Sequence, residues 1–196
     1  MQDAMIAAVV LAAGLSRRMG EFKLLLPWDG TTVIGRVVAT LESAGVPDIV
    51  VVTGHRADLV AQSLAGSTAR FAFNPNYAAA EMMSTIQVGL RALGPQAEAA
   101  LICLGDQPQM EASTVSALVA EASREGWNAI TIPSYGMRGG HPILLARVVW
   151  PDVLSAAGTL REVVHADRSR VYYRPVATTT VLADLDTPED YRDSSR

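Results

Sequence analysis

The sequence predicts an α/β protein built on a doubly wound, mostly parallel, Rossmann-like sheet. Apolar runs rich in Val, Ile and Leu recur along the chain, and amphipathic helical patterns separate them. Runs without polar alternation are typical of strands that are covered on both faces, as in a parallel sheet. Because such sheets bind ligands at the carboxyl ends of their strands, we expect the function to lie in the loops that follow the strands.

The first two thirds of the chain alternate between the two kinds of element. Five apolar runs are expected to be strands buried on both faces, at 4–12, 48–54, 70–73, 99–105 and 128–133. Four segments with apolar residues near every 3.6 positions are expected to be helices that end at or near a glycine, at 31–45, 55–66, 82–94 and 111–126. Right-handed connections between such elements give the doubly wound arrangement.

The regular alternation of strand and helix patterns ends at about Gly136. Here we expect a helix at about 159–166, two or three further strands, one of which could be antiparallel, and a short last helix opened by Pro188. The strand candidates lie in 136–150, 170–176 and 178–193. We find no internal repeat and no low-complexity linker, so we expect a single domain over 1–196 whose part from 136 onward completes the sheet and covers the ligand cleft.

Composition excludes several classes of protein. The 16 Lys and Arg residues against 20 Asp and Glu residues give a net charge of -4, which argues against a nucleic-acid binder. No apolar run approaches the ~18 residues of a membrane span, and the first residues are predicted to be a strand rather than a signal peptide. A single cysteine and the absence of zinc-type spacing indicate a reducing compartment, so we expect a cytoplasmic protein.

The loop after the first strand, 11–27, combines small and basic residues. Its glycines fit neither the P-loop pattern nor the dinucleotide pattern. The backbone amides of a small-residue turn can bind an anion, and the charges of Arg17, Arg18 and Lys23 suit a triphosphate. The alternative is an ordinary loop with solvated basic residues.

Acidic residues follow two of the expected strands. Asp106 comes directly after 99–105 and could hold Mg²⁺, or it could be a turn or capping residue. Asp186 could supply a second carboxylate, because Mg²⁺ is usually held by one or two protein carboxylates together with phosphates and water. Asp184 alternates with Asp186 and is expected on the same strand face, whereas Asp190 is expected to cap the last helix or to be solvated.

Two further segments carry weaker signals. His141 follows a Gly-Gly pair and could donate to a phosphate or a substrate, although a lone histidine is more often structural. Asn74, Ser84 and Thr85 could face a base and a ribose, or could cap the helix that follows them. Cys103 lies within an apolar strand and is expected to be a core residue.

In this order, the motifs LAAGLSRRMGEFKLLLP, VVVTGH, NPNY, LGDQP, GGHPILL and LDTPEDY resemble those of the MobA-like nucleotidyltransferase superfamily, over almost the whole chain. Within it the chain is most similar to the molybdenum cofactor cytidylyltransferases, which have the nucleotide-diphospho-sugar transferase type of fold. Guanylyltransferase relatives usually carry a double glycine where this chain has Ala13 before Gly14, and this difference favours cytosine. The resemblance implies Mg²⁺-dependent transfer of CMP from CTP to the phosphate of molybdopterin, with release of pyrophosphate.

The resemblance also implies roles for individual residues. The base and the ribose would be bound by Leu11, Ala12, Ala13 and Gly14, by Thr53 and Gly54, and by Ser84. Arg18 and Lys23 would bind the triphosphate and act in catalysis together with Asp106. Asp106 and Asp186 would hold the metal ion, and His141 would lie toward the acceptor. Residues up to about 135 would thus bind the nucleotide, and residues from about 136 to 196 would lie on the acceptor side.

One segment departs from the family pattern, which commonly reads G-M-S-[ST]-S-L after N-P-x-Y. This chain has Glu81 in place of the glycine and Met83 in place of a serine, so the acceptor or the preferred nucleotide could have changed. The open alternatives are a GTP-using enzyme, transfer to another small phosphorylated acceptor such as a sugar phosphate, and a non-catalytic module that delivers the cofactor to a client molybdenum enzyme. An NAD-dependent dehydrogenase is disfavoured by the missing glycine pattern.

Overall fold

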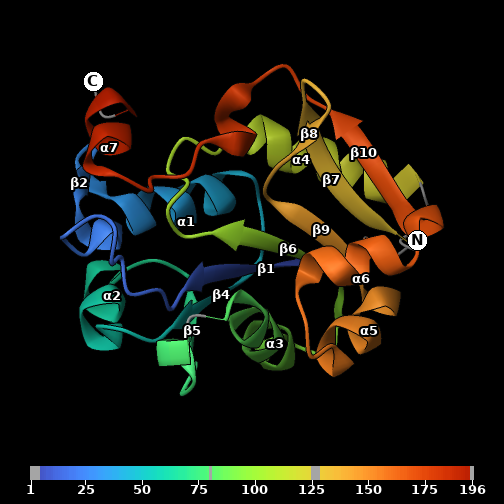
Figure 1. Ribbon diagram of the computed structural model, residues 1–196, viewed down its shortest axis with the longest axis horizontal. Coiled ribbons are helices and arrows are strands. Elements are labelled where there is room, and N and C mark those ends of the chain that lie inside the picture. The colour runs from blue at the N-terminus through green and yellow to red at the C-terminus, as the bar shows by residue number, and fades with distance from the viewer. Residues whose placement is uncertain (1–4, 80, 125–128, 195–196) are drawn as a thin grey trace.

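A mixed sheet of eight strands forms the centre of the computed structural model, which describes residues 5–79, 81–124 and 129–194 (Figure 1). The strand order is β10-β7-β9-β6-β1-β4-β5, with β8 paired to β7. Their bounds are β1 Met5–Ala12, β4 Asp48–Thr53, β5 Arg70–Phe73, β6 Ala97–Leu104, β7 Ile130–Tyr135, β8 Arg138–Gly139, β9 Ile143–Ala146 and β10 Val171–Pro175. A small separate hairpin is formed by β2 Pro27–Trp28 and β3 Thr31–Thr32.

The strand directions confirm the predicted sheet. Strands β6, β1, β4 and β5 run parallel to one another, and β10 runs parallel to β7. Strand β9 is antiparallel to both β6 and β7, as one of the later strands was expected to be. The carboxyl ends of β1, β4 and β6 therefore meet at one edge of the sheet, where a doubly wound fold binds its ligands.

Helices cover both faces of the sheet. One face is packed by α1 Val33–Ser43, α2 Ala57–Ser63 and α4 Ala112–Arg124, and the other by α3 Met82–Ala92, α5 Trp150–Ser155 and α6 Leu160–Ala166. The last helix, α7 Pro188–Ser194, packs against the β2–β3 hairpin through Tyr191 and Trp28. In the part of the chain that the structure describes, no helix has the length and apolar character needed to cross a membrane.

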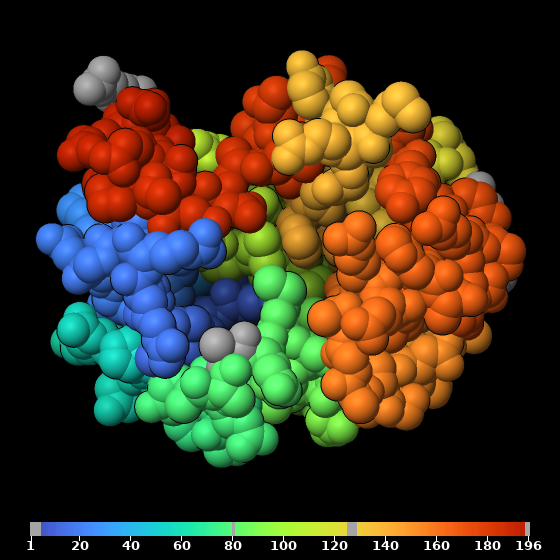
Figure 2. All heavy atoms as spheres, viewed as in Figure 1, coloured from blue at the N-terminus to red at the C-terminus, as the bar shows by residue number. Residues whose placement is uncertain are grey.

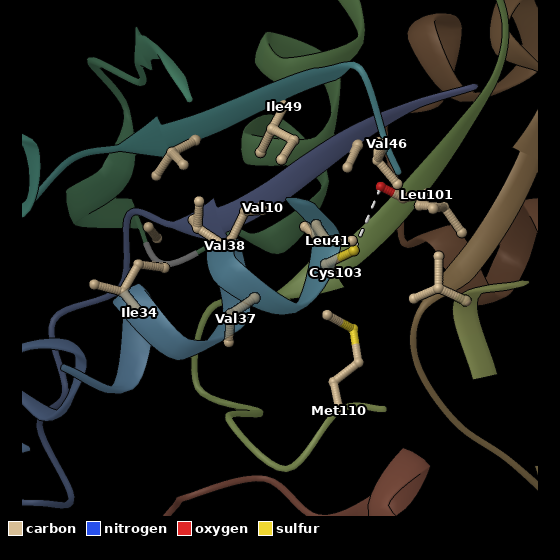
Figure 3. Packing of buried hydrophobic residues seen from close by; sticks show 14 of the residues in the cluster. Val10, Ile34, Val37, Val38, Leu41, Val46, Ile49, Leu101, Cys103 and Met110 are labelled. Carbon is tan, nitrogen blue, oxygen red and sulfur yellow. Dashed lines mark hydrogen bonds between the residues drawn. The ribbon is translucent and has the colours of Figure 1, made fainter. Parts of the chain in front are cut away.

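The α1 face shows how the amphipathic patterns are buried. Ile34, Val37, Val38 and Leu41 of α1 belong to one buried cluster with Val10, Ile49 and Leu101 of the sheet (Figure 3). Cys103 lies in the same cluster, as expected of a core residue, and burial raises the pKa of its thiol. On the opposite face, Gly89 lets α3 approach β1 closely, because a Cβ at this position would overlap the side chain of Val9.

Two expectations about strands are wrong. The run 70–73 forms β5, but it is the edge strand of the sheet, so Phe71 and Phe73 are exposed rather than buried on both faces. The segment that carries Asp184 and Asp186 is not a strand: a 3₁₀ turn at Thr179–Leu182 is followed by irregular backbone up to α7. The expected elements also reach residues 4, 125, 126 and 128, which lie outside the described residues.

Candidate active site

The floor of the site is formed where β1 and β6 end side by side. Leu11 of β1 is paired in register with Leu104 of β6, and the backbone amide of Gly105 donates to the Leu11 carbonyl at 3.1 Å. A Cβ at Gly105 would lie 2.7 Å from that carbonyl oxygen, so glycine permits this close approach. The sheet register thereby brings Asp106, the next residue, beside the loop that follows β1.

Lys23 reaches into this corner from a 3₁₀ turn at Lys23–Leu25. The turn is anchored by the buried side chain of Leu24 and by the Ser16 hydroxyl, which accepts from the backbone amide of Lys23 at 3.3 Å. The Lys23 ammonium contacts the carboxylate of Asp106 and lies 3.5 Å from Oδ1 of Asp186. One cation therefore brings together the two carboxylates that the sequence pairs as metal ligands.

Asp186 belongs to the C-terminal part of the chain, and the preceding residue, Leu185, fixes its position in the site. The Leu185 side chain is buried with Trp28 and Val33, and its amide donates to the Asp106 carbonyl at 3.2 Å. Its own carbonyl accepts from Nζ of Lys23 at 2.9 Å. Arg18 then pairs with the Asp186 carboxylate through two hydrogen bonds of 2.8 and 2.9 Å. Backbone and side-chain bonds thus connect the loop after β1, the end of β6 and the segment before α7.

A third carboxylate, Asp184, lies in the same corner. Nε2 of Gln107 donates to its Oδ1 at 2.5 Å, and Gln107 itself is almost completely buried. Burial raises the pKa of Asp184, and the negative charges of Asp106 and Asp186 raise it further, whereas the Gln107 hydrogen bond and Lys23 act in the opposite direction. Gln107 directly follows Asp106 in LGDQP, but an uncharged side chain gave no signal there from which its role could be predicted.

These residues lie in a cleft of about 400 Å³ at the carboxyl edge of the sheet. Figure 2 shows the hollow between the blue N-terminal segment, the green start of α3 and the red segment that carries Asp184 and Asp186. Of the predicted residues, Leu11, Ala13, Gly14, Arg18, Lys23, Asp106 and Asp186 line this cleft. Ala12 is fully buried in the core on the α1 side of the sheet.

Two other predicted nucleotide residues, Thr53 and Gly54, lie behind the cleft wall. Thr53 is buried, and its hydroxyl donates to the Ala72 carbonyl at 3.4 Å. Gly54 packs against Tyr77, and a Cβ at Gly54 would overlap the Cβ of that tyrosine. It is the side chain of Tyr77 that lines the cleft on this side. The structure thus gives Thr53 and Gly54 a supporting position behind the wall.

Ser84 lies in the first turn of α3, whose N-terminus has no side-chain cap, so the capping alternative that the sequence left open is wrong for this helix. Its hydroxyl donates to the Glu81 carbonyl at 2.9 Å and accepts from Nδ2 of Asn74 at 3.0 Å. The same Asn74 amide group donates to the Thr85 hydroxyl at 3.0 Å. The cleft wall at this helix is instead formed by Glu81, Met82 and Thr85, so Glu81, which departs from the family pattern, faces the candidate site.

His141 lines a second, larger pocket of about 1180 Å³ that shares Glu81 and Met82 with the cleft. Its backbone amide donates to the Val181 carbonyl at 2.9 Å. Burial lowers the pKa of its imidazole to about 4, although the negative charge of Asp106 acts in the opposite direction. The side chain is therefore neutral at pH 7, and a neutral imidazole can both donate and accept one hydrogen bond.

The donor set fits a divalent cation that is completed by its substrate. Asp106 and Asp186 offer carboxylate oxygens beside the partly buried Asp184, so negative charge accumulates in this corner. Among the described residues, no three His, Cys, Asp or Glu side chains come together closely enough to bind a metal ion alone. Carboxylate oxygens are donors that Mg²⁺ and Mn²⁺ prefer, with phosphate oxygens and water in their remaining positions.

Fold and site together define a class of enzyme, the nucleotidyltransferases, in which a nucleotide cleft at the carboxyl edge of a mixed sheet joins acidic residues to a basic, small-residue loop. Residues 8–171 match the model of the MobA-like NTP transferase domain, and the chain belongs to this family. This result confirms the family that the sequence motifs indicated.

Individual relatives agree with this assignment. The chain is 26% identical to the molybdenum cofactor cytidylyltransferase of Escherichia coli, over 95% of this chain and 93% of that protein. It is 35% identical to the bifunctional protein GlmU of Stutzerimonas stutzeri over 79% of this chain, but it spans only 35% of that longer protein.

Solved structures are similar over nearly the full length. A nucleotidyl transferase from Methanothermobacter superposes with a TM-score of 0.85 at 28% identity, covering 97% of this chain and 96% of that one. The Mycobacterium tuberculosis protein Rv0371c, solved in complex with manganese, superposes with a TM-score of 0.78 at 28% identity, covering 97% of this chain and 98% of that one.

Proposed function

We propose that this nucleotidyltransferase transfers CMP from CTP to the phosphate of molybdopterin, in a reaction that depends on Mg²⁺ and releases pyrophosphate. One observation carries the proposal: Asp106 and Asp186 meet at the Lys23 ammonium, in a cleft that the basic loop after β1 also lines. This corner combines carboxylates for a divalent ion with cations for a triphosphate.

Asp106 and Asp186 would hold the metal ion, and Asp184, kept in place by Gln107, would add negative charge behind them. When bound, Mg²⁺ neutralises charge on the α-phosphate and so makes its phosphorus more open to attack. The manganese complex of the M. tuberculosis relative supports a divalent ion at a site of this kind. Mg²⁺ itself is our proposal from the carboxylate donor set.

The residues of the chain position the reactants and compensate charge. An oxygen of the acceptor phosphate attacks the α-phosphorus in line, a new O–P bond forms, and the bond to the β-phosphate oxygen breaks as pyrophosphate leaves with the electron pair. Lys23 and Arg18 would bind the departing phosphates, and Arg18 would exchange its present partner Asp186 for them. Because this transfer depends on positioning and electrostatics, no serine or cysteine nucleophile is required.

The cytosine base is proposed to lie against the loop that begins at Leu11. Ala13 and Gly14 line the cleft, and residues this small leave room for a base against the loop. Tyr77 lines the cleft beside them and packs against Gly54. The likeness to the E. coli cytidylyltransferase over 95% of the chain supports CTP as the donor.

The acceptor is proposed to bind on the side of residues 136–196, beyond Glu81 and Met82. His141 lies in this pocket and can donate a hydrogen bond to the acceptor without adding a charge. The molybdopterin product would pass to a client molybdenum enzyme, and we propose the cytoplasm as the site of the reaction.

The proposal is tested by supplying CTP, GTP, ATP and UTP in turn, with Mg²⁺ and molybdopterin, and by measuring both pyrophosphate and the dinucleotide product. We expect CTP to be the productive donor and EDTA to abolish turnover. Productive GTP would instead favour a guanylyltransferase. Folded protein that binds molybdopterin but releases no pyrophosphate with any nucleotide would favour the delivery module.

A further inference from the structure

Gln107 is a buried polar side chain in the turn that follows β6, directly after Asp106. The residue is only 1% exposed. Its backbone is fixed on both sides, because its amide donates to the Leu104 carbonyl at 3.4 Å and its carbonyl accepts from the Met110 amide at 3.1 Å. A polar side chain that is buried to this extent needs a hydrogen-bond partner.

The partner of Gln107 is a carboxylate. Nε2 of Gln107 donates to Oδ1 of Asp184 at 2.5 Å and lies 3.5 Å from the carbonyl oxygen of Val181. A hydrogen bond to an ionised acceptor is roughly twice as strong as one between neutral groups. The buried amide group of Gln107 therefore fixes the orientation of the Asp184 carboxylate.

The backbone on either side of Asp184 has anchors of its own. The Ala183 amide closes the preceding 3₁₀ turn, and the Leu185 amide donates to the Asp106 carbonyl at 3.2 Å. The path of the chain consequently does not depend on Gln107 alone. What the Gln107 hydrogen bond adds is a fixed direction for one side chain, the carboxylate of Asp184.

The other side of Asp184 is open to the cleft. Asp184 is an exposed residue and lines the cleft together with Asp106 and Asp186. Within the described part of the chain, Oδ2 of Asp184 receives no hydrogen bond from another protein group. Over residues 5–79, 81–124 and 129–194, no three acidic, His or Cys side chains converge closely enough to coordinate one ion together. Asp184 therefore lies near the cation site without completing a cage of three carboxylates.

We propose that Asp184 is an outer-sphere acceptor of the cation site and that Gln107 is its positioning residue. A divalent ion held by Asp106 and Asp186 keeps several waters, and such waters donate hydrogen bonds to nearby carboxylates. Because Gln107 occupies Oδ1, Oδ2 of Asp184 is the oxygen that accepts from a metal-bound water. This inference rests on the metal site of the proposed function, but not on CTP, on the acceptor or on turnover.

Affinity for Mn²⁺ tests the inference in the absence of nucleotide, from the electron paramagnetic resonance of the free ion. Asp184→Asn keeps an oxygen acceptor for Gln107 but removes the charge, and it should weaken Mn²⁺ binding by about 10-fold, the size typical of an outer-shell partner. Gln107→Met keeps an unbranched side chain without the donor and should weaken Mn²⁺ binding at least ~3-fold. The double variant should bind Mn²⁺ no more weakly than Asp184→Asn, because Gln107 acts through the Asp184 carboxylate.

Gln87→Met is the matched control, because the Gln87 amide group donates to the Val153 and Ala156 carbonyls and does not line the cleft. It should leave Mn²⁺ affinity at the wild-type value. An unchanged affinity in Gln107→Met, or a further loss in the double variant, overturns the positioning role. An unchanged affinity in Asp184→Asn overturns the outer-sphere role, even if Gln107→Met does not fold. A wild-type protein that binds no Mn²⁺ would overturn the metal site of the proposed function, and this inference with it.

Discussion

The Lys23 ammonium and the Asp106 carboxylate form an ion pair in which both side chains are largely buried, at 15% and 17% exposure. The two residues come from loops that follow neighbouring parallel strands, and Leu185 joins the pair through hydrogen bonds to each of them. A buried pair of this kind needs a partner for every charge. A ligand that binds one member of this ion pair must therefore provide a partner for the charge of the other.

Replacement of Asp106 tests the metal and catalytic role. Asp106→Ala should lower kcat by at least ~100-fold, as single electrostatic catalysts do, and should leave the thermal melt close to that of the wild type. The fold is preserved because Leu185 bonds the Asp106 backbone carbonyl, which the substitution keeps, and Lys23 retains Asp186 nearby. Asp152→Asn, in a surface ion pair with Arg170, is the control and should retain full activity. Near-normal turnover of Asp106→Ala would remove this residue from the site.

Lys23 is the only lysine in the chain, so its substitution changes one specific ammonium. Lys23→Met should weaken nucleotide binding and slow the reaction. It should also bind Mn²⁺ at least ~10-fold more tightly in the absence of nucleotide, because a unit charge about 4 Å away costs several kcal/mol to a divalent ion. Electron paramagnetic resonance of free Mn²⁺ measures this affinity.

The control for net charge is Arg36→Met, on the exposed side of α1. It should leave Mn²⁺ affinity at the wild-type value. If Lys23→Met binds Mn²⁺ no more tightly than the wild type and Arg36→Met do, the ammonium does not compete with the metal ion for the carboxylates.

The base preference should depend on Ala13. Its side chain lines the cleft, and its carbonyl accepts from the His55 amide at 3.4 Å, a bond that a glycine would keep. Ala13→Gly makes room for a larger base, and we expect the ratio of kcat/KM for GTP to that for CTP to rise at least ~5-fold, within the range for one methyl group. Ala12→Gly is the adjacent control, because Ala12 faces the core. It should lower stability without changing the ratio.

The stability of the protein should fall in weak acid because of His141. Its pKa is lowered from 6.5 to about 4, so the unfolded chain takes up a proton below pH 6.5 that the folded protein refuses until about pH 4. This residue's contribution is therefore complete above pH 6.5 and is lost between pH 6.5 and 4, by at most about 3 kcal/mol.

Urea unfolding at pH 7 and at pH 4.5 measures the effect. His141→Gln should lose less free energy of unfolding over this interval than the wild type. His165→Gln, at an exposed position on α6, should behave as the wild type does. Parallel curves for all three proteins would show that the buried imidazole is not responsible.

Much of the fold could be predicted because periodicity reports burial. Strands β1, β4, β6 and β7 and helices α1, α3 and α4 lie where their apolar patterns placed them. The apolar pattern failed to predict the exposure of β5, because an apolar run does not reveal whether its strand lies at the edge or the centre of a sheet. The order of the strands is set by their tertiary pairing. The pattern also failed at Asp184 and Asp186. There, acidic and apolar residues alternate in irregular backbone, which is held by the hydrogen bond from the Leu185 amide to the carbonyl of Asp106, just after β6.

The site was predictable where residues directly follow strands. Asp106 and the loop after β1 were found in this way, because parallel strands bring their carboxyl ends together. Gln107 and the Leu185 carbonyl gave no comparable signal: one is an uncharged neighbour of an aspartate, and the other is a backbone group whose partner depends on the tertiary fold. The predicted roles of individual residues toward the nucleotide remain predictions.

Leu185 is synthesised after almost all of the sheet, because it follows every strand in the sequence. While the chain is being made, β1, β6 and Lys23 can already assemble, but Asp106 has no neighbouring Leu185 amide and Arg18 has no carboxylate at position 186. A polypeptide that stops before position 185 would hold most of the sheet, yet it would lack the Asp186 carboxylate and the backbone groups of Leu185 that bond Lys23 and Asp106. The candidate site is therefore completed only when this late segment folds onto the finished sheet.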